Sequence, residues 1–310
     1  MPVTAVFDRL ALERHTWTWR DRQIQYAVCG QGQPLLLIHG FGASIGHWRN
    51  NIPEWSRAGY RVYAIDLLGF GDSEKAPIDY SLEIWRDLIC DFWDAFVGEP
   101  TVWVGNSIGA LLALMVAAEH PEKTRGAVLL NCAGGLNHRP DELSPILGFV
   151  LGSFAKVVSA PVIGELLFQV VRRPSQIRRT LTQVYRNRAA IDDELVDLLY
   201  RPSCDPNAQK VFASILTAPA GPKPADLLPH VQSPMLVLWG EDDPWTPIDG
   251  ARIYQDWDGE ASIDFFAIPN AGHCPHDDRP DVVNTRVLDW LAELAFHDNH
   301  AHADRESLAS

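Results

Sequence analysis

The segment Thr101-Val-Trp-Val-Gly105-Asn106-Ser107-Ile108-Gly109-Ala110-Leu-Leu-Ala-Leu114 decides the fold, because it joins a predicted strand to a predicted helix. Its first four residues are a short apolar run typical of a strand buried on both faces, and its last five continue as an apolar helix. The residues between them match G-x-S-x-G, in which flanking glycines relieve a crowded turn and the serine hydroxyl stands at a helix N-terminus. This context predicts that Ser107 is a nucleophile at the edge of a sheet.

A second match to the same pentapeptide, Gly42-Ala-Ser-Ile-Gly46, occurs earlier in the chain, which illustrates how weak the motif is alone. Its serine, Ser44, belongs to a glycine-rich loop that begins at His39, directly after another apolar run. A loop in that position can turn a backbone N–H toward the nucleophile. We therefore expect the backbone N–H groups of Phe41 and Ile108 to form an oxyanion hole, and we expect Ser44 to be dispensable for catalysis.

A serine hydroxyl needs a neighbouring base to attack a carbonyl near neutral pH. Of the eleven histidines, His273 is the best placed, because it follows the last predicted strand, where a loop can return over the sheet edge. The acid that orients this histidine should follow the preceding strand, where Gly240-Glu-Asp-Asp243 offers three carboxylates. Asp243 fits the spacing G-x-x-D-x-x-x-P and is the predicted acid, with Asp242 as the alternative. We expect His276 to be a surface histidine near the start of a helix.

Short apolar runs alternate with helical stretches along most of the chain. Such alternation predicts an α/β fold with a mostly parallel sheet, flanked by helices and connected by right-handed crossovers. The order Ser, Asp, His along the chain is that of the α/β-hydrolase fold. The predicted strands are Thr16–Arg20, Gln23–Cys29, Pro34–Ile38, Val62–Ile65, Thr101–Val104, Ala127–Leu130, Met235–Trp239 and Ile263–Ile268, and the predicted helices are Ser81–Val97, Ile108–His120 and Pro280–Phe296.

The alternation stops in the middle of the chain, which divides it into a core and an insert. We predict an α/β-hydrolase core of residues 1–138 and 231–297, a helical cap of residues 139–230, and a disordered tail of residues 298–310. A cap placed there would cover the carboxyl edge of the sheet, where open α/β sheets bind ligands.

Residues 143–171 are the most apolar part of this cap, but glycines and prolines interrupt them, which argues against a membrane-spanning helix. The segment could form an apolar slot for substrate, or it could only pack the cap onto the core. For the first alternative, the predicted substrate-binding residues are Leu147, Leu151, Phe154 and Phe168.

The composition limits the partners that this chain can have. A formal net charge of −14 argues against nucleic acid, which requires a basic face, and against electrostatic attraction to anionic membranes. Five cysteines without a C-x-x-C pair fit a reducing compartment. Residues 1–15 contain no apolar run, so no secretory signal is predicted and we expect an intracellular protein. We expect no cofactor and no metal.

Several segments of the chain together carry a family resemblance. They are Leu82-Glu-Ile-Trp-Arg-Asp87, Gly98-Glu-Pro100, Gly105-Asn-Ser107, Leu181–Tyr185, Ser214–Pro219, Gly240–Trp245 and Ala271–Asp277. Those that contain the triad resemble the α/β-hydrolase superfamily. The whole set more narrowly resembles the plastid and cyanobacterial hydrolases that remove phytol from chlorophyll or pheophytin, the pheophytinase and chlorophyll dephytylase group. Ala110 departs from this pattern, since a second glycine is common there, and the cap helices match less clearly.

This resemblance implies a serine carboxylic-ester hydrolase that acts through the same triad and an acyl-enzyme. It implies a phytylated chlorin as the hydrophobic ester substrate, with any Mg²⁺ belonging to that substrate, and peripheral contact of the apolar cap with thylakoid membranes. Three alternatives stay open: a generic small-ester hydrolase, a hydrolase-fold ligand receptor, and a carbon–carbon hydrolase of the meta-cleavage type. The last class typically has Trp directly after the catalytic histidine, whereas Cys274 follows His273 here.

Overall fold

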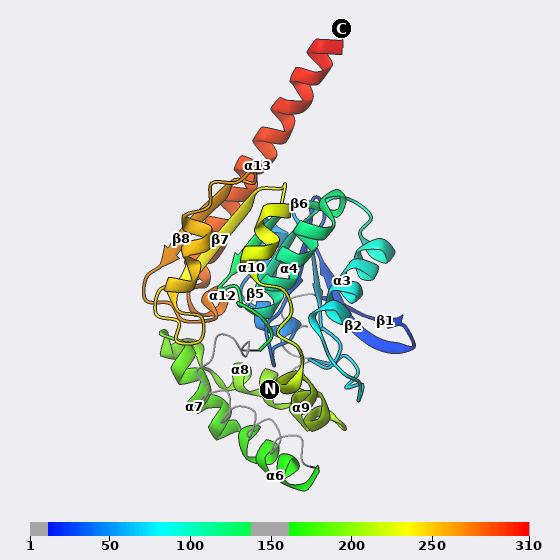
Figure 1. The fold of residues 1–310 in the computed structure, drawn as a ribbon, viewed down its shortest axis with the longest axis vertical. Helices are drawn as coiled ribbons and strands as arrows, with labels where there is room; N and C mark the ends of the chain where they lie inside the picture. Colours follow the sequence, from blue (N-terminus) through cyan, green and yellow to red (C-terminus); the bar gives the residue numbers. More distant parts are fainter. Residues whose placement is uncertain (1–11, 138–160, 310) are drawn as a thin grey trace.

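The computed structural model describes residues 12–137 and 161–309. Its centre is an eight-stranded sheet in the order β1-β2-β4-β3-β5-β6-β7-β8 (Figure 1). β2 pairs antiparallel with β1 and β4, and the remaining pairings are parallel, which confirms the predicted fold class. The strands are β1 (Glu13–Trp19), β2 (Arg22–Cys29), β3 (Pro34–Ile38), β4 (Arg61–Ile65), β5 (Thr101–Asn106), β6 (Thr124–Leu130), β7 (Met235–Gly240) and β8 (Ile263–Ile268).

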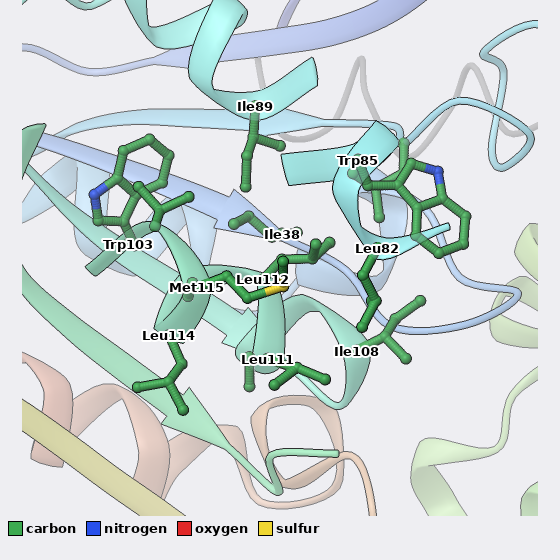
Figure 2. Close-up of a cluster of buried hydrophobic side chains, with 14 of the residues drawn as sticks. Ile38, Leu82, Trp85, Ile89, Trp103, Ile108, Leu111, Leu112, Leu114 and Met115 are labelled. Atoms are coloured by element: carbon green, nitrogen blue, oxygen red, sulfur yellow. The ribbon is translucent and has the colours of Figure 1, made fainter. Parts of the chain in front are cut away.

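Two hydrophobic layers cover the sheet, one on each face. In β3, Leu36 belongs to one layer and Leu37 to the other, because successive side chains of a strand point to opposite faces. The first layer packs against α3 and α4 (Figure 2), and the second packs against α2 and α13. Burial on both faces explains why these strands are apolar throughout. The helices are α2 (Ile52–Arg57), α3 (Leu82–Phe96), α4 (Ile108–Glu119) and α13 (Pro280–Ala309).

Between β6 and β7, the described residues form helices and loops but no strand. Helices α6 to α9 of this insert lie beyond one edge of the sheet (Figure 1), and we refer to the segment that contains them as the cap, whereas α10 and η6 pack against α4 of the core. Of the predicted substrate-binding residues, Leu147, Leu151 and Phe154 lie outside the described residues, whereas Phe168 is buried in α6. The insert contains α6 (Pro161–Val171), α7 (Pro174–Val184), η4 (Arg188–Ala190), α8 (Asp193–Tyr200), η5 (Pro202–Cys204), α9 (Ala208–Thr217), α10 (Pro224–Leu227) and η6 (Leu228–His230).

The end of the chain differs from the expected disordered tail. Helix α13 continues to Ala309 and projects away from the core (Figure 1). Residues 297–309 contain neither glycine nor proline, so no strong helix breaker ends α13 where its apolar pattern stops. Within the described ranges, no helix is both long and apolar enough to cross a bilayer. The remaining short elements are η1 (Ile45–Trp48), η2 (Pro121–Lys123), η7 (Ile248–Ala251), α11 (Arg252–Gln255) and α12 (Pro275–Asp278).

Candidate active site

Ser107 lies on a sharp turn between β5 and α4, with a strained backbone at φ 57° and ψ −118°. Both glycines of the pentapeptide are required by close backbone packing. A Cβ on Gly105 would lie 2.1 Å from the carbonyl oxygen of Gly109, and a Cβ on Gly109 would lie 2.1 Å from that of Ile38. The turn therefore has the features of a nucleophile elbow, with the serine at the start of α4.

His273, in the loop after β8, connects Ser107 to Asp243. Its Nε2 atom lies 2.9 Å from Ser107 Oγ, and its Nδ1 atom lies 2.6 Å from Asp243 Oδ2. When Nδ1–H donates to the carboxylate, Nε2 has a free lone pair and can accept the proton of the serine hydroxyl. All three residues are buried. The fold thus brings together the three side chains that the sequence predicts as a triad, although Ser107 and His273 are 166 positions apart.

Asp243 accepts hydrogen bonds from several neighbours besides His273. They are Asn131 Nδ2 at 2.7 Å, the backbone N–H of Trp245 at 2.7 Å, and the hydroxyl of Thr246. Burial alone would raise the pKa of Asp243, but the hydrogen bonds from His273, Thr246 and the Trp245 N–H keep this pKa below its ordinary value. The carboxylate is therefore ionised at neutral pH and can stabilise a protonated imidazole.

Two asparagines that the sequence reasoning did not single out connect the loops of this site. Asn131, directly after β6, donates to Asp243 and accepts a 2.9 Å hydrogen bond from the N–H of Gly240. Asn106, directly before the serine, donates to the carbonyl oxygen of His273 at 2.9 Å. Both residues stand where an apolar strand run ends, at the carboxyl edge of a parallel sheet. That position is the signal that could have identified them.

The loop after β3 brings backbone N–H groups to the serine. A Cβ on Gly40 would lie 3.3 Å from Ser107 Cβ, so this loop runs directly beside the nucleophile. Across residues 12–137 and 161–309, no hydrogen bond engages the backbone N–H of Phe41 or of Ile108. These two predicted donors are therefore available to a negatively charged oxygen next to Ser107.

Two buried side chains hold this loop in place. His39 Nδ1–H donates to the Gly40 carbonyl at 2.7 Å, while Nε2 accepts from the Leu67 N–H at 3.0 Å. Burial lowers the pKa of His39 to about 4, so the ring is neutral and can fill both roles. Asp66 accepts from the N–H of Ile45 at 2.7 Å, and burial raises its pKa to about 6. The Asp66 side chain thus supports the site by accepting a hydrogen bond from the backbone after the β3 loop.

Two of the sequence alternatives lie outside the hydrogen-bonded chain. Ser44 is the N-terminal cap residue of η1. Asp242 has 46% of its side chain exposed and faces the guanidinium of Arg186 at 3.4 Å. The geometry therefore separates Ser107 from Ser44 and Asp243 from Asp242 as the sequence context predicts.

The expectation that His276 is a surface residue is wrong. Its exposed fraction is 0%, and its ring packs 4.3 Å from that of Trp48 and 4.6 Å from that of His47. Burial, with the neighbouring imidazoles of His47 and His273, places its pKa well below the ordinary value. The cause is the packing of α12 against η1, two elements far apart in the sequence.

An apolar cavity of about 250 Å³ lies between the cap and the core loops that carry the site residues. On the core side it is lined by Phe41, Trp245 and Cys274, which lie on the oxyanion, acid and histidine loops. The indole of Trp245 is 5.1 Å from the imidazole of His273, so the cavity begins beside the base. Phe168, which the sequence analysis names as a substrate-binding residue, lines this cavity from the cap.

The doubly covered parallel sheet, the strained serine elbow and the order of the site residues together define an α/β hydrolase. The family model described as "Alpha/beta hydrolase family" matches residues 35–286, and the chain belongs to this family. This membership supports an enzyme with hydrolytic activity.

Two characterised relatives are similar over most of the chain. "Pheophytinase, chloroplastic" of Arabidopsis thaliana is 30% identical over 321 residues, which cover 89% of this chain and 66% of that longer protein. The 2-hydroxymuconate semialdehyde hydrolase of Pseudomonas sp. (strain CF600) is 31% identical over 277 residues, covering 85% of this chain and 88% of the relative. The chain is therefore similar both to a pheophytinase and to a semialdehyde hydrolase.

Solved structures agree on the fold. The serine hydrolase involved in carbazole degradation (CarC) superposes with a TM-score of 0.72 at 24% identity, covering 91% of this chain and 99% of that structure. A bacterial membrane phospholipase A superposes with a TM-score of 0.73 at 24% identity, covering 94% and 89%.

Proposed function

We propose that this protein is a serine carboxylic-ester hydrolase whose catalytic residues are Ser107, His273 and Asp243. The observation that carries the proposal is the hydrogen-bonded chain from Ser107 Oγ through His273 to Asp243, with distances of 2.9 and 2.6 Å. The N–H groups of Phe41 and Ile108, which make no hydrogen bond within the described ranges, complete the arrangement.

The reaction follows from this geometry. His273 Nε2 takes the proton of Ser107 as Oγ attacks the ester carbonyl, and the developing oxyanion accepts hydrogen bonds from the two backbone N–H groups. The carbonyl re-forms as the alcohol leaves with the proton from His273, which gives an acyl-enzyme. A water molecule then attacks by the same route, and the carboxylic acid is released with Ser107 regenerated.

The apolar cavity favours an ester with a long hydrocarbon group, and we propose a phytyl ester of a chlorin, such as chlorophyll or pheophytin. Aliphatic and aromatic side chains form most of the cavity wall, so transfer of hydrocarbon from water is favourable there. Phe41 and Trp245 line the cavity and are exposed by 39% and 52%, so their rings can contact a flat chlorin. The similarity to pheophytinase supports this choice.

Carbon–carbon bond cleavage is the second candidate, because relatives include 2-hydroxy-6-oxo-6-phenylhexa-2,4-dienoate hydrolase of Burkholderia cepacia, 30% identical. A dienoate substrate needs a cationic partner for its carboxylate. Among the described lining residues, Lys75 and Arg172 are cationic, but both are engaged: Lys75 pairs with Asp205 at 3.0 Å, and Arg172 donates to Ser203 at 3.2 Å. This favours an uncharged ester.

Helix α6 supports a further part of the proposal, peripheral contact with a pigment-bearing membrane. Ile163 and Leu166 are exposed by 56% and 64%, and Val170 and Val171 by 40% and 43%, so the helix presents an apolar outer face. With a net charge of −14, such contact would be apolar rather than electrostatic.

The decisive experiment incubates the enzyme with pheophytin a, chlorophyll a and a phenyl-hexadienoate, and measures released phytol and cleaved dienoate. Ser107→Ala should lower ester turnover by roughly 10³- to 10⁶-fold, whereas Ser44→Ala, the matched control, should retain it. Equal losses in the two folded variants would refute the assignment of the nucleophile. Cleavage of the dienoate without ester turnover would favour the second candidate.

A further inference from the structure

The loop that carries His273 is bonded directly to the cap. The backbone N–H of His273 donates to the carbonyl of Val184, the last residue of α7, at 2.9 Å. Next to it, a Cβ on Gly272 would lie 1.9 Å from the same carbonyl oxygen. The cap therefore touches the backbone of the proposed base, with no room for a side chain between them.

Asp278 joins the same two segments through its carboxylate. Oδ2 accepts from the N–H of Gly272 at 2.8 Å and from that of Arg186 at 2.9 Å, while Oδ1 accepts from the N–H of Asn187 at 2.7 Å. The exposed fraction of Asp278 is 0%. One buried carboxylate thus gathers a backbone donor of the histidine loop and two of the cap.

We infer that Asp278 is a positioning residue for His273, and that the cap segment Val184–Asn187 is part of the apparatus that orients the base. The inference rests on the proposed function, in which Nε2 must stay within hydrogen-bonding reach of Ser107. A displacement of about 1 Å in a catalytic group costs about 100-fold in rate. By bonding the residue before His273 to the cap, Asp278 restricts this displacement.

Asp277 provides a natural comparison, because it is adjacent, equally buried and also bonded across the cap boundary. Its oxygens accept from side chains: Tyr185 Oη at 3.0 Å, Arg49 Nε at 3.0 Å and Asn50 Nδ2 at 2.8 Å. No hydrogen bond within the described ranges connects its carboxylate to the backbone of residues 271–274. Asp277 therefore holds the cap to the core, whereas Asp278 holds the histidine loop to the cap.

The test compares Asp278→Asn with Asp277→Asn in the full chain. An Asn side chain at 278 presents an NH₂ group, which only donates, to backbone N–H groups that also donate. We expect kcat for a short p-nitrophenyl ester to fall about 100-fold with KM unchanged. Asp277→Asn should lower the thermal midpoint Tm, because the buried Arg49 loses a countercharge. Its kcat should fall much less than that of Asp278→Asn, because within the described residues Asp277 reaches the orienting segment only through the side chain of Tyr185.

A second pair of variants tests the contact itself. Gly272→Ala places a methyl group against the Val184 carbonyl and should lower kcat in the same way, whereas Gly250→Ala, whose Cβ meets no atom within 4 Å, should be neutral. The inference would be overturned if kcat followed Tm in all four variants, or if Asp278→Asn changed only KM.

A substrate-independent readout separates this inference from the proposed function. The rate at which a fluorophosphonate labels the serine depends on proton removal by His273, with fluoride leaving as the Ser107 Oγ–phosphorus bond forms. A slower labelling of Asp278→Asn than of Asp277→Asn supports the positioning role even if no tested ester is turned over. Equal labelling rates would refute it even if the wild-type enzyme is an active esterase.

Discussion

The cap contacts the core in two different ways at its two sides. From Tyr185 to Asp192 it is held by buried polar bonds, which we call the anchored side. At α6 and at Phe212 of α9 it faces the cavity with hydrocarbon, which we call the apolar side, although Ser214 of α9 also bonds the backbone of Ile78 and Tyr80. The difference is one of geometric tolerance, because hydrogen bonds and ion pairs require a particular distance and angle, whereas apolar contacts do not.

Arg49 is the centre of the anchored side. Its guanidinium, with 5% of the side chain exposed, bonds Asp277 at 3.0 Å in the core, and Asp192 at 2.8 Å and the Ala190 carbonyl at 3.0 Å in the cap. Tyr185 of the cap also forms a hydrogen bond with the core, between its Oη atom and His47 Nε2 at 2.7 Å. This side is therefore fixed next to Asp278, the residue that we propose positions His273.

On the apolar side, the contacts are made by aromatic rings instead of charged groups. Phe212 of α9 lies 5.4 Å from Phe168 of α6 and 6.0 Å from Phe41 of the oxyanion loop, measured between ring centroids. Leu166, also on α6, is exposed by 64%. The comparison teaches that the cap combines a rigid attachment beside the base with an adaptable wall around the proposed hydrocarbon site.

The largest effect on stability should come from breaking the anchored side. Arg49→Met leaves Asp277 buried without its cationic partner, so the free energy of unfolding should fall by about 3–5 kcal/mol. Urea denaturation checks this value. The control is Arg252→Met, which removes an exposed pair with Asp249 and should leave the unfolding curve unchanged. Similar losses in both variants would show that the anchored side contributes no more than a surface ion pair.

The second effect is the pH dependence of the anchored side. Burial lowers the pKa of His47 from 6.5 to about 4. The carboxylate of Asp277 raises this pKa, whereas the charges of Arg49 and His273 lower it further. As pH falls from 6.5 to 4, the unfolded chain binds a proton that folded His47 does not bind. The contribution of His47 to stability should therefore fall over this range by at most about 3 kcal/mol.

Urea titrations from pH 7 to pH 4 measure this slope, which His47→Gln should make shallower. Asp66 acts in the opposite sense, because its folded pKa of about 6 exceeds the ordinary 3.8, so its contribution is lost as pH rises through this interval. An unchanged slope in His47→Gln would assign the acid sensitivity to other groups.

The third effect concerns the apolar side and the substrate. Phe168→Asp should lower kcat/KM for a long-chain ester about 60-fold, which corresponds to losing the burial of three CH₂ groups, about 2.4 kcal/mol. Turnover of a short p-nitrophenyl ester should persist, because its chemistry does not use the cavity. Leu166→Asp lies on the exposed side of the same helix and is the matched control. Parallel loss of both rates in a folded Phe168 variant would contradict the cavity's role.

The smallest effect is expected at the outer face of α6. The double variant Ile163→Ser, Leu166→Ser should co-sediment less with phosphatidylcholine vesicles than the wild type does. Its Tm should not fall, because both side chains are already exposed. Mild detergent should release the wild-type protein from pigment-bearing membranes, whereas added salt should not. Release by salt would indicate an electrostatic attachment instead.

The chain order of the site could be predicted because each part depends on local pattern. The serine turn at Ser107 can be predicted from the sequence, because the apolar strand, the two glycines and the apolar helix that form it are contiguous in the chain. Asp243 and His273 are readable because a parallel sheet returns the carboxyl end of every strand to one edge. The supporting residues Asn131 and Asp278 are not readable in this way, since their partners lie on other loops.

By itself, the sequence determined the parallel sheet, the serine turn after β5 and the proposal of Ser107, His273 and Asp243 as a triad. Only the tertiary structure decided that His276 is buried, that α13 continues to Ala309, and that the cap bonds to the histidine loop through Asp278. The physical reason is the separation in sequence over which each kind of interaction acts. Strand and helix periodicity depend on neighbours within a few positions, whereas the partners of a buried polar group are set by which distant segments pack together.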